Sequence, residues 1–305
     1  TAQAPVANKP SAATGDRAIA APAVRRRAWE LGVDLQAIPG TGPGGRITQA
    51  DLEAFSAGAA TGSAGSDQRF AKNHDEEVIP VIGLRRKIAQ KMQEAKRRIP
   101  HFTYVEEIDV TELEDLRLQL NARHGASRGR LTLLPFLIRA MVLAVRQHPE
   151  VNARYDDDAG VLTRYGAIHM GLATQTEAGL MVPVIRHAES LDLWACAAEV
   201  VRLAQAARSG KASRDELNGS TLTLTSLGAL GGIVSTPVIN HPEVAIVGTN
   251  RIVERPMVKG GAVVVRKMMN LSSSFDHRVV DGLHAAEFIQ QLRSYLECPG
   301  TLFVE

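Results

Sequence analysis

Two periods of apolar and polar positions run along residues 79–305, and together they predict an α/β domain. A period near 3.6 residues predicts helices, whereas a period of two predicts half-buried strands. We expect helices at 84–98, 111–120, 131–148, 193–209 and 285–296. We expect strands at 101–110, 167–172, 181–185, 220–226, 244–248 and 262–271. Because the two kinds of element do not alternate strictly, a mixed sheet is favoured over a purely parallel one.

The segment 220–226 alternates more strictly than any other. Thr221, Thr223 and Thr225 fall on one face of this predicted strand, and two leucines fall on the other. The strand leads into 227–232, which contains three glycines and is flexible enough to admit a ligand close to its backbone.

The first 78 residues follow a different pattern. Residues 1–19 and 56–78 are rich in Ala, Gly and Ser with scattered charges, which is typical of flexible linkers. Between them, 20–55 contains two short helical patterns around a Gly-rich loop, and Thr48 with Asp51 forms a capping box. We therefore expect a small helical domain at 20–55 and one large domain at 79–305, and we expect a chain that begins in a linker to be part of a longer protein.

Composition limits the class of protein. The chain has 305 residues, a hydrophobic content of 45% and a formal net charge of +2. Cys196 and Cys298, the two cysteines, stand in no metal-ligand spacing, which favours a reducing compartment with both thiols free. The longest apolar run is interrupted by Pro135 and Arg139, so neither a membrane span nor a signal peptide is predicted. We expect no membrane and no nucleic acid among the partners.

The segment 274–282, with the sequence SFDHRVVDG, contains the densest candidate chemistry. It places His277 between Asp276 and Asp281, where a predicted strand gives way to a predicted helix. An imidazole beside a carboxylate suits general-base catalysis, since its pKa lies near neutrality. A buried structural histidine would fit the same short pattern. No serine or cysteine stands in a nucleophile-elbow pattern, and no zinc spacing is present, so such a base would act on a thiol or hydroxyl of the substrate itself.

A substrate thiol is the better match to a histidine base. A thiol with a pKa of about 8.5 needs only a modest base, which points to acyl transfer from one thiol to another. The oxyanion of the tetrahedral intermediate then needs a hydrogen-bond donor, and Thr225 or Ser226 could supply one worth about 3–4 kcal/mol.

Two basic clusters allow more than one interpretation. The predicted helix at 84–98 carries seven Lys and Arg against one Glu, which suits a solvated face or the phosphates of coenzyme A. The Gly-rich loop at 41–46 lacks both the Walker lysine and a G-x-G-x-x-G pattern, which disfavours nucleotide binding. The alternative is a set of tight turns beside a basic face for an acidic protein, formed by Arg25, Arg26, Arg27 and Arg46.

The small domain carries PAVR at 22–25, GVD at 32–34 and GTGPGGRI at 40–47, followed by Asp51. This succession resembles the peripheral subunit-binding domain of 2-oxo acid dehydrogenase complexes. The resemblance implies that Arg25 and Arg46 pair with carboxylates of the 2-oxo acid decarboxylase or the dihydrolipoamide dehydrogenase component. Trp29 stands where family members often carry a second arginine, so stacking would replace part of the electrostatic binding.

The large domain carries a series of landmarks in a fixed order. These are LRRKIA at 84–89, IPHFT at 99–103, LLPF at 133–136, GLMVPVI at 179–185, TLTLTSLG at 221–228, PEVAI at 242–246 and DHRVVDG at 276–282. The series resembles the catalytic domain of dihydrolipoamide acyltransferases along its full length. The resemblance implies a chloramphenicol-acetyltransferase-like fold and trimers with active sites between subunits. Eight or twenty such trimers would form a hollow core, a 24-mer or a 60-mer.

The resemblance also implies roles for individual residues. His277 would take the proton from the thiol of coenzyme A or dihydrolipoamide, Asp281 would hold the local geometry, and Thr225 would donate to the oxyanion from another chain. Ser226 is the second choice for this donor. Contacts with coenzyme A are expected from Ser226, Arg85 and Ser274, and no metal is expected.

The acyl substrate, the lipoyl domain and the cellular location are predicted from less specific features of the sequence. Segments 254–258 and 266–274 resemble branched-chain acyltransferases more than acetyl or succinyl ones. No lipoyl domain is present in 1–305, so we expect the lipoyl group on a domain upstream of Thr1. A non-catalytic scaffold of the same architecture is the main alternative, while the subunit-binding domain disfavours a free-standing acetyltransferase. A bacterial cytoplasm is favoured over a mitochondrial matrix.

Overall fold

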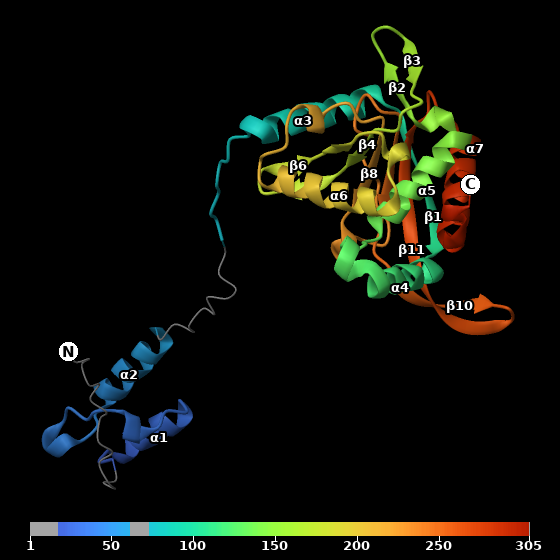
Figure 1. The fold of residues 1–305 in the computed structure, drawn as a ribbon. Coiled ribbons are helices and arrows are strands. Elements are labelled where there is room, and N and C mark those ends of the chain that lie inside the picture. Colours follow the sequence, from blue (N-terminus) through green and yellow to red (C-terminus); the bar gives the residue numbers. More distant parts are fainter. Residues whose placement is uncertain (1–17, 62–72, 305) are drawn as a thin grey trace, which may run out of the picture. The chain divides into compact units, whose positions relative to one another are not determined.

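The computed structural model describes residues 18–61 and 73–304, which fall into two compact units (Figure 1). The chain passes from the first unit to the second between Val78 and Ile79. Within the described residues, no helix is long and apolar enough to span a bilayer.

The first unit consists of two helices joined by short turns. α1 (Pro22–Glu30) and α2 (Gln49–Thr61) flank the 3-10 turns η1 (Leu35–Ala37) and η2 (Pro43–Gly45). Its core is made of Val24, Ala28, Ile38, Ile47 and Leu52. α2 continues to Thr61, six residues past the predicted end of the small domain. The reason is that 56–61 is rich in Ala, the strongest helix former, although its composition also suits a linker.

Asp51 holds the Gly-rich loop onto the start of α2. The predicted capping box is present: Thr48 Oγ1 accepts from Asp51 N–H at 3.3 Å, and Asp51 accepts from Thr48 N–H at 2.9 Å. The Asp51 carboxylate also accepts from the hydroxyl of Thr41 at 2.7 Å and from the backbone N–H of Thr41 at 3.0 Å. The Thr41 hydroxyl bond is the main reason that the pKa of Asp51 lies well below its usual range. Gly44 and Gly45 both have positive φ, at 68° and 73°, so the glycines of this loop serve tight turns.

The second unit is built around a seven-stranded mixed sheet, which confirms the predicted fold class. The strand order is β1-β11-β9-β8-β4-β7, and β10 pairs with the outer part of β11. The strands are β1 (His101–Asp109), β4 (Met170–Leu172), β7 (Val184–Ile185), β8 (Leu222–Ser226), β9 (Ala245–Thr249), β10 (Val253–Lys259) and β11 (Ala262–Asp276). β8 runs parallel to both of its neighbours, and the other pairs are antiparallel.

Five long helices accompany this sheet (Figure 1). They are α3 (Gly83–Arg98), α4 (Thr111–Arg128), α5 (Leu134–Gln147), α6 (Leu193–Arg208) and α7 (Gly282–Glu297). α5 is buried along most of its length and packs between α6 and α7, so one contiguous core joins these helices to the sheet. Pro135 explains why α5 begins at Leu134 rather than at Leu131, because proline is favoured in the first turn of a helix.

Several predicted boundaries are wrong at solvent-exposed elements. α4 continues eight residues beyond the predicted end at 120, through a polar stretch without apolar periodicity. Between the predicted strands at 167–172 and 181–185, the structure has a hairpin of β5 (Thr174–Thr176) and β6 (Gly179–Met181). Neither β10 nor the hairpin of β2 (Ala153–Asp156) and β3 (Val161–Arg164) was predicted, because exposed ribbons lack the alternation that burial of one face imposes.

The two faces of the sheet differ in chemistry. The face toward the helices is apolar and includes Leu224, Val247, Leu271 and Phe275. Because side chains alternate along a strand, the neighbouring positions face the other way. The pairing register places hydroxyl, amide and carboxylate side chains on that second face: Thr103, Thr223, Thr225, Asn270, Ser272, Ser274 and Asp276. The sheet therefore carries this polar cluster on the side away from the main core, whereas Ser273 and Thr249 lie on the apolar face.

Candidate active site

His277 directly follows β11, in the turn that leads to α7. Its N–H donates to the carbonyl of Pro100 at 3.2 Å, and its ring lies against Phe102 with the centroids 4.5 Å apart. The side chain is exposed. The alternative of a buried structural histidine is therefore wrong for His277.

Asp276 fixes the backbone on both sides of His277. It is 1% exposed, its N–H donates to Val244 at 2.8 Å, and its carbonyl accepts from Val280 N–H at 2.9 Å. The carboxylate accepts from the backbone N–H of Arg278 at 3.0 Å and from its guanidinium at 2.7 and 2.9 Å. These bonds to Asp276 are the main cause of the raised pKa of Arg278, so the guanidinium stays charged throughout the physiological range.

Asp281 is the N-cap of α7. Its carboxylate accepts from the N–H of His284 at 2.9 Å, which is the main cause of its lowered pKa. The side chain is 57% exposed. Asp281 therefore lies where it can hold the end of the turn that carries His277, which supports the positioning role expected of it.

We expect Asp281→Asn to keep most of the activity and Asp281→Ala to lose more. Asn and Asp are equally good N-caps, so the Asn variant should retain at least about half of the wild-type kcat. The Ala variant leaves the N–H of His284 without its cap, and we expect a lower melting temperature together with a lower kcat. Calorimetry and acyl-transfer rates on both variants check this. Equal losses in the two variants would mean that the charge of Asp281 matters rather than its cap.

Thr225 and Ser226 end β8 and face opposite sides of the sheet. Within the part of the chain that the structure describes, the Thr225 hydroxyl has no hydrogen-bond partner. Ser226 Oγ accepts from the N–H of Gly228 at 3.2 Å and borders a cavity of about 630 Å³ that also includes Arg208 and Arg251. Of the two hydroxyls, that of Thr225 is thus the more available to donate to an oxyanion.

Buried Glu243 forms hydrogen bonds with residues at the start of β8, the strand that carries Thr225. Glu243 accepts from Thr223 Oγ1 and from Asn240 Nδ2, each at 2.6 Å, and from the Ser220 hydroxyl. Complete burial is the main cause of the raised pKa of Glu243. No pattern in the sequence predicts this network, because it joins β8 to the segment before β9.

Thr225 and His277 lie at opposite ends of the sheet. Thr225 is level with Gly248 of β9, and Gly248 is level with Ser272 of β11, five residues before His277. At about 3.3 Å per residue, the two positions are about 17 Å apart along the strands, and two strand spacings add to this separation. Within one chain, the two side chains therefore cannot act on the same thioester.

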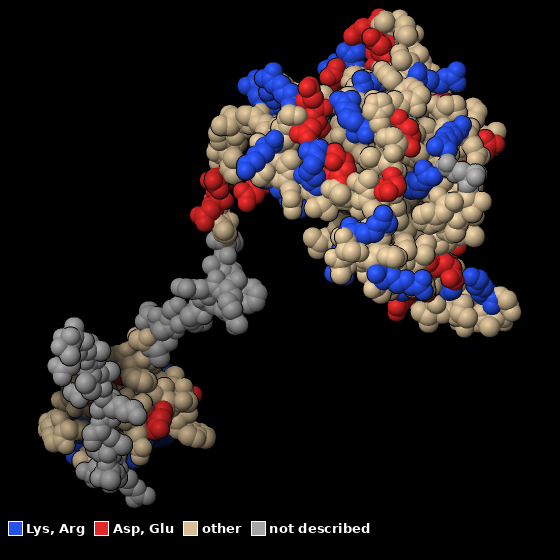
Figure 2. Space-filling view, viewed as in Figure 1, with Lys and Arg blue, Asp and Glu red and all other residues tan. Residues whose placement is uncertain are grey.

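The expected coenzyme A contacts differ in their surroundings. Ser274 is 1% exposed and its hydroxyl bonds with Thr103 Oγ1 at 3.0 Å, so the structure gives no support to a contact there. Arg85 is exposed in the first turns of α3. Figure 2 shows basic side chains over α3 interspersed with acidic and uncharged ones rather than in a continuous patch. Contacts from Arg85 and Ser226 remain predictions.

His101 was not singled out in the sequence, yet it supports the same turn. Its Nε2 accepts from the N–H of Ile239 at 3.0 Å, so Nδ1 carries the proton and donates to the carbonyl of Ile99 at 2.9 Å. Burial lowers the pKa of His101, which favours this neutral form. His101 also pairs in register with Asp276. It therefore ties β1 and the end of β11 to the loop before β9.

Neither cysteine nor metal chemistry is indicated in the described residues. Residues 18–61 and 73–304 contain no group of three or more His, Cys, Asp and Glu arranged to hold a metal ion. Both cysteines are free, and burial raises the pKa of the Cys196 thiol to about 12. Neither thiol lies beside His277 in the fold.

Comparison with known proteins decides the family. Residues 73–304 match the catalytic domain of the 2-oxoacid dehydrogenases acyltransferase family, and residues 18–53 match the e3 binding domain. The chain belongs to the 2-oxoacid dehydrogenase acyltransferase family. It is therefore an acyltransferase, as the resemblance implied, and a subunit-binding domain precedes its catalytic domain.

The chain is similar to branched-chain components in particular. The lipoamide acyltransferase component of the branched-chain alpha-keto acid dehydrogenase complex of Pseudomonas aeruginosa is 68% identical over 95% of this chain and 68% of the relative. The same component of Pseudomonas putida is 64% identical over 95% of this chain and 69% of the relative. The acetyltransferase component of the Staphylococcus aureus (strain MRSA252) pyruvate dehydrogenase complex is 35% identical over 99% of this chain and 75% of the relative.

Solved structures of acetyltransferase cores share the fold. The dihydrolipoamide acetyltransferase of Azotobacter vinelandii has a TM-score of 0.73 at 35% identity, covering 77% of this chain and 97% of that chain. Its catalytic mechanism was investigated at a serine, at a histidine fifty-two residues later and at an asparagine four residues after the histidine. The cubic core of a pyruvate dehydrogenase multienzyme complex has a TM-score of 0.73 at 36% identity, with the same coverage of 77% and 97%.

Proposed function

We propose that this chain transfers a branched-chain acyl group between dihydrolipoamide and coenzyme A, with His277 as the base and Thr225 as the oxyanion donor. The exposed His277 in a turn pinned by Asp276 and Asp281 is the observation that carries the chemistry. The 68% identity to a branched-chain component, against 35% to an acetyltransferase component, supports the acyl group.

The proposed mechanism uses two side chains. His277 accepts the proton of the attacking thiol, and the new sulfur–carbon bond converts the thioester carbonyl to an oxyanion. The Thr225 hydroxyl donates a hydrogen bond to that oxyanion, which is stronger in the transition state than in the ground state. His277 then returns its proton to the leaving thiolate as the old sulfur–carbon bond breaks.

The spacing of the residues supports this choice of hydroxyl. Thr225, His277 and Asp281 have the separations of the serine, histidine and asparagine investigated in the Azotobacter vinelandii enzyme, fifty-two and four residues. Ser226 does not have the first separation. The asparagine of that relative also suits the N-cap position of Asp281, because Asn and Asp cap helices equally well.

The proposed site needs two subunits. Since Thr225 and His277 lie at opposite ends of one sheet, a second chain has to supply one of them. We infer trimers with a site at each of three equivalent interfaces, because the family resemblance implies trimers and a heterologous contact whose rotation closes gives a ring. The similarity to a cubic core favours eight trimers over twenty.

We infer that the first unit binds dihydrolipoamide dehydrogenase, with the decarboxylase as a further candidate. The match to the e3 binding domain supports this. Arg46 is exposed, whereas the Arg25 guanidinium donates to the domain's own carbonyls at Ala18 and Ala20, at 2.7 and 3.1 Å. Arg46 is therefore the better placed of the two to meet a partner's carboxylate. Trp29, 84% exposed, could add an apolar contact.

The lipoyl group and the location complete the proposal. We expect a lipoyl group on a separate domain to carry the acyl group to His277, and the bacterial relatives favour a bacterial cytoplasm.

Rates with three acyl donors test the acyl group. We expect kcat/KM for isobutyryl-coenzyme A to exceed that for succinyl-coenzyme A by at least about 10-fold, because a pocket for a branched apolar group leaves the free carboxylate of the succinyl group without a partner. Acetyl-coenzyme A should fall between them, since it lacks two methyl groups but adds no charge. Transfer to free dihydrolipoamide is the assay. A preference for the succinyl donor would overturn the branched-chain assignment.

A further inference from the structure

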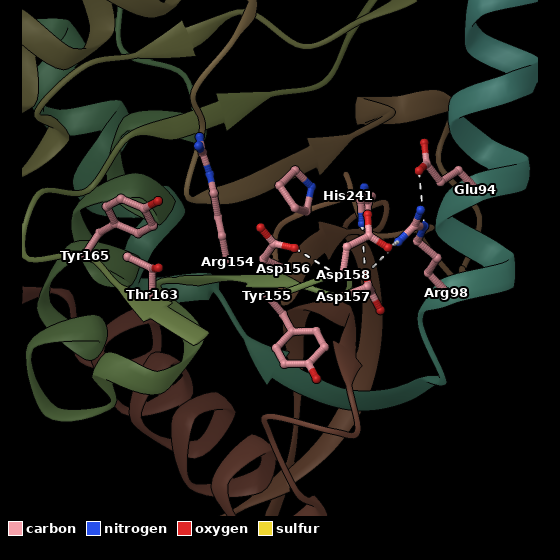
Figure 3. Close-up of a pocket in the computed structure, with 11 residues that line it drawn as sticks. Glu94, Arg98, Arg154, Tyr155, Asp156, Asp157, Asp158, Thr163, Tyr165 and His241 are labelled. Carbon is pink, nitrogen blue, oxygen red and sulfur yellow. Dashed lines mark hydrogen bonds and ion pairs between the residues drawn. The ribbon is translucent and has the colours of Figure 1, made fainter. Parts of the chain in front are cut away.

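The hairpin of β2 and β3 reaches the turn that carries His277. β3 is exposed throughout, and the hairpin pairs with no strand of the main sheet. Figure 3 shows Asp156, Asp157 and Asp158 at the end of β2, close to His241 and to Arg98 of α3. None of the roles assigned above uses these residues.

Arg278, which directly follows His277, connects this hairpin to the turn. Its Nε and Nη2 donate to the carboxylate of Asp276 at 2.9 and 2.7 Å, and its Nη1 donates to Oδ1 of Asp157. The guanidinium also lies over the ring of Tyr155, 4.4 Å from the centroid. All three nitrogens and one face of this side chain are therefore occupied, two of these contacts coming from the hairpin.

Asp157 is mostly buried and contacts two further side chains besides Arg278. It is 15% exposed, and its second oxygen lies 3.3 Å from His241 Nε2 and 3.9 Å from Arg98 Nη1. Burial raises the pKa of Asp157, but hydrogen bonds from Arg278 and His241 outweigh burial and bring the pKa below its usual value. The carboxylate is thus charged at neutral pH and meets Arg278 as an ion pair.

The adjacent carboxylates do not reach Arg278. Asp156 accepts from the backbone N–H groups of Asp158 and Ala159, each at 3.0 Å, and so closes the hairpin turn. Asp158 is 86% exposed and pairs with Arg98 at 3.1 Å. Apart from Asp276, Asp157 is the acid among the described residues that pairs with Arg278.

We propose that Asp157 is a positioning residue for His277 and acts through Arg278. This inference rests on the proposed function, which makes His277 the base. In the described residues no hydrogen bond holds the His277 ring, so its direction depends on its backbone and on the Phe102 contact. The backbone of Arg278 shares a peptide bond with His277. A clamp on the Arg278 side chain between Asp276 and Asp157 therefore limits the directions in which the imidazole can point.

Asp157→Ala tests the clamp, with Asp158→Ala as its matched control. We expect Asp157→Ala to lower kcat about 10-fold, since loss of alignment by a fraction of an ångström costs rate, while KM for coenzyme A and dihydrolipoamide stays within about two-fold. The kcat of Asp157→Asn should fall between those of the wild type and of Asp157→Ala, because the amide oxygen still accepts a hydrogen bond from Arg278 but carries no charge. Asp158→Ala should match the wild type.

A double variant distinguishes positioning from general stability. Arg278→Lys loses the forked donor geometry, so Asp157→Ala should lower kcat no further when it is added to Arg278→Lys. A wild-type kcat in Asp157→Ala, equal losses in Asp157→Ala and Asp158→Ala, or a loss confined to KM would each overturn the proposal. If Asp157→Ala does not fold, Asp157→Asn in the same assays decides. Activity that survives His277→Ala would instead overturn the proposed function, so the two failures can be told apart.

Discussion

Replacing His277 by alanine should lower kcat for acyl transfer by about 10³-fold, the range typical of a lost general base. The side chain is exposed in its turn, and no other histidine lies between Asp276 and the N-cap of α7. Since the ring makes no hydrogen bond within the described residues, its removal should leave the fold and the core assembly intact.

His284→Ala is the matched control for this variant. His284 stands on the first turn of the same helix and is also exposed. Its Nδ1 lies 3.3 Å from the Asp281 carboxylate, but alanine preserves the backbone N–H that donates to the cap. We expect kcat within about two-fold of wild type, as for most surface substitutions. Both variants are assayed with free dihydrolipoamide as acceptor. Nearly undiminished transfer by His277→Ala would show that His277 is not the base.

Replacing Thr225 by alanine should lower kcat by about 10²-fold, which corresponds to the loss of one oxyanion donor. Its hydroxyl has no partner in the described part of the chain, so alanine breaks no hydrogen bond of the folded subunit there. Thr225→Ser should retain most of the activity, because serine supplies the same donor at the same position.

Ser226→Ala separates the two candidate hydroxyls. Ser226 faces the other side of β8, and its oxygen accepts from Gly228, so we expect a change in kcat of less than about three-fold. Calorimetric titration with coenzyme A should show similar affinity for Thr225→Ala and Thr225→Ser, because oxyanion stabilisation acts in the transition state. A larger loss in Ser226→Ala than in Thr225→Ala would transfer the role to Ser226.

Periodicity in the sequence predicts the elements that bury one face. α6 and α7 lie within a few residues of their predicted bounds, since each presents an apolar stripe to the core. β11 continues five residues past its predicted end. The sequence does not predict this extension because four of the five residues at 272–276 are polar, and two of them, Ser272 and Ser274, form side-chain hydrogen bonds in the fold. Exposed ribbons such as β10 and the β2–β3 hairpin bury little, so their sequences carry no clear period.

The candidate site is predictable only in part. His277, Asp281 and Thr225 stand in local motifs, so the sequence can point to each one. Their relation in space depends on the register of β8, β9 and β11, which the sequence does not show. The pairing of Asp157 with Arg278 joins residues far apart in the chain and depends on an unpredicted hairpin. Local signals predict residues, whereas long-range pairing decides which of them meet.

A mixture of two inactive chains tests most directly whether the active site is shared between subunits. His277→Ala and Thr225→Ala chains are co-expressed in equal amounts, and kcat is measured per assembled subunit. With random mixing in a ring, about a quarter of the interfaces combine an intact His277 with an intact Thr225, so we predict about a quarter of wild-type activity. Activity no higher than that of the separate variants would contradict a site built from two chains.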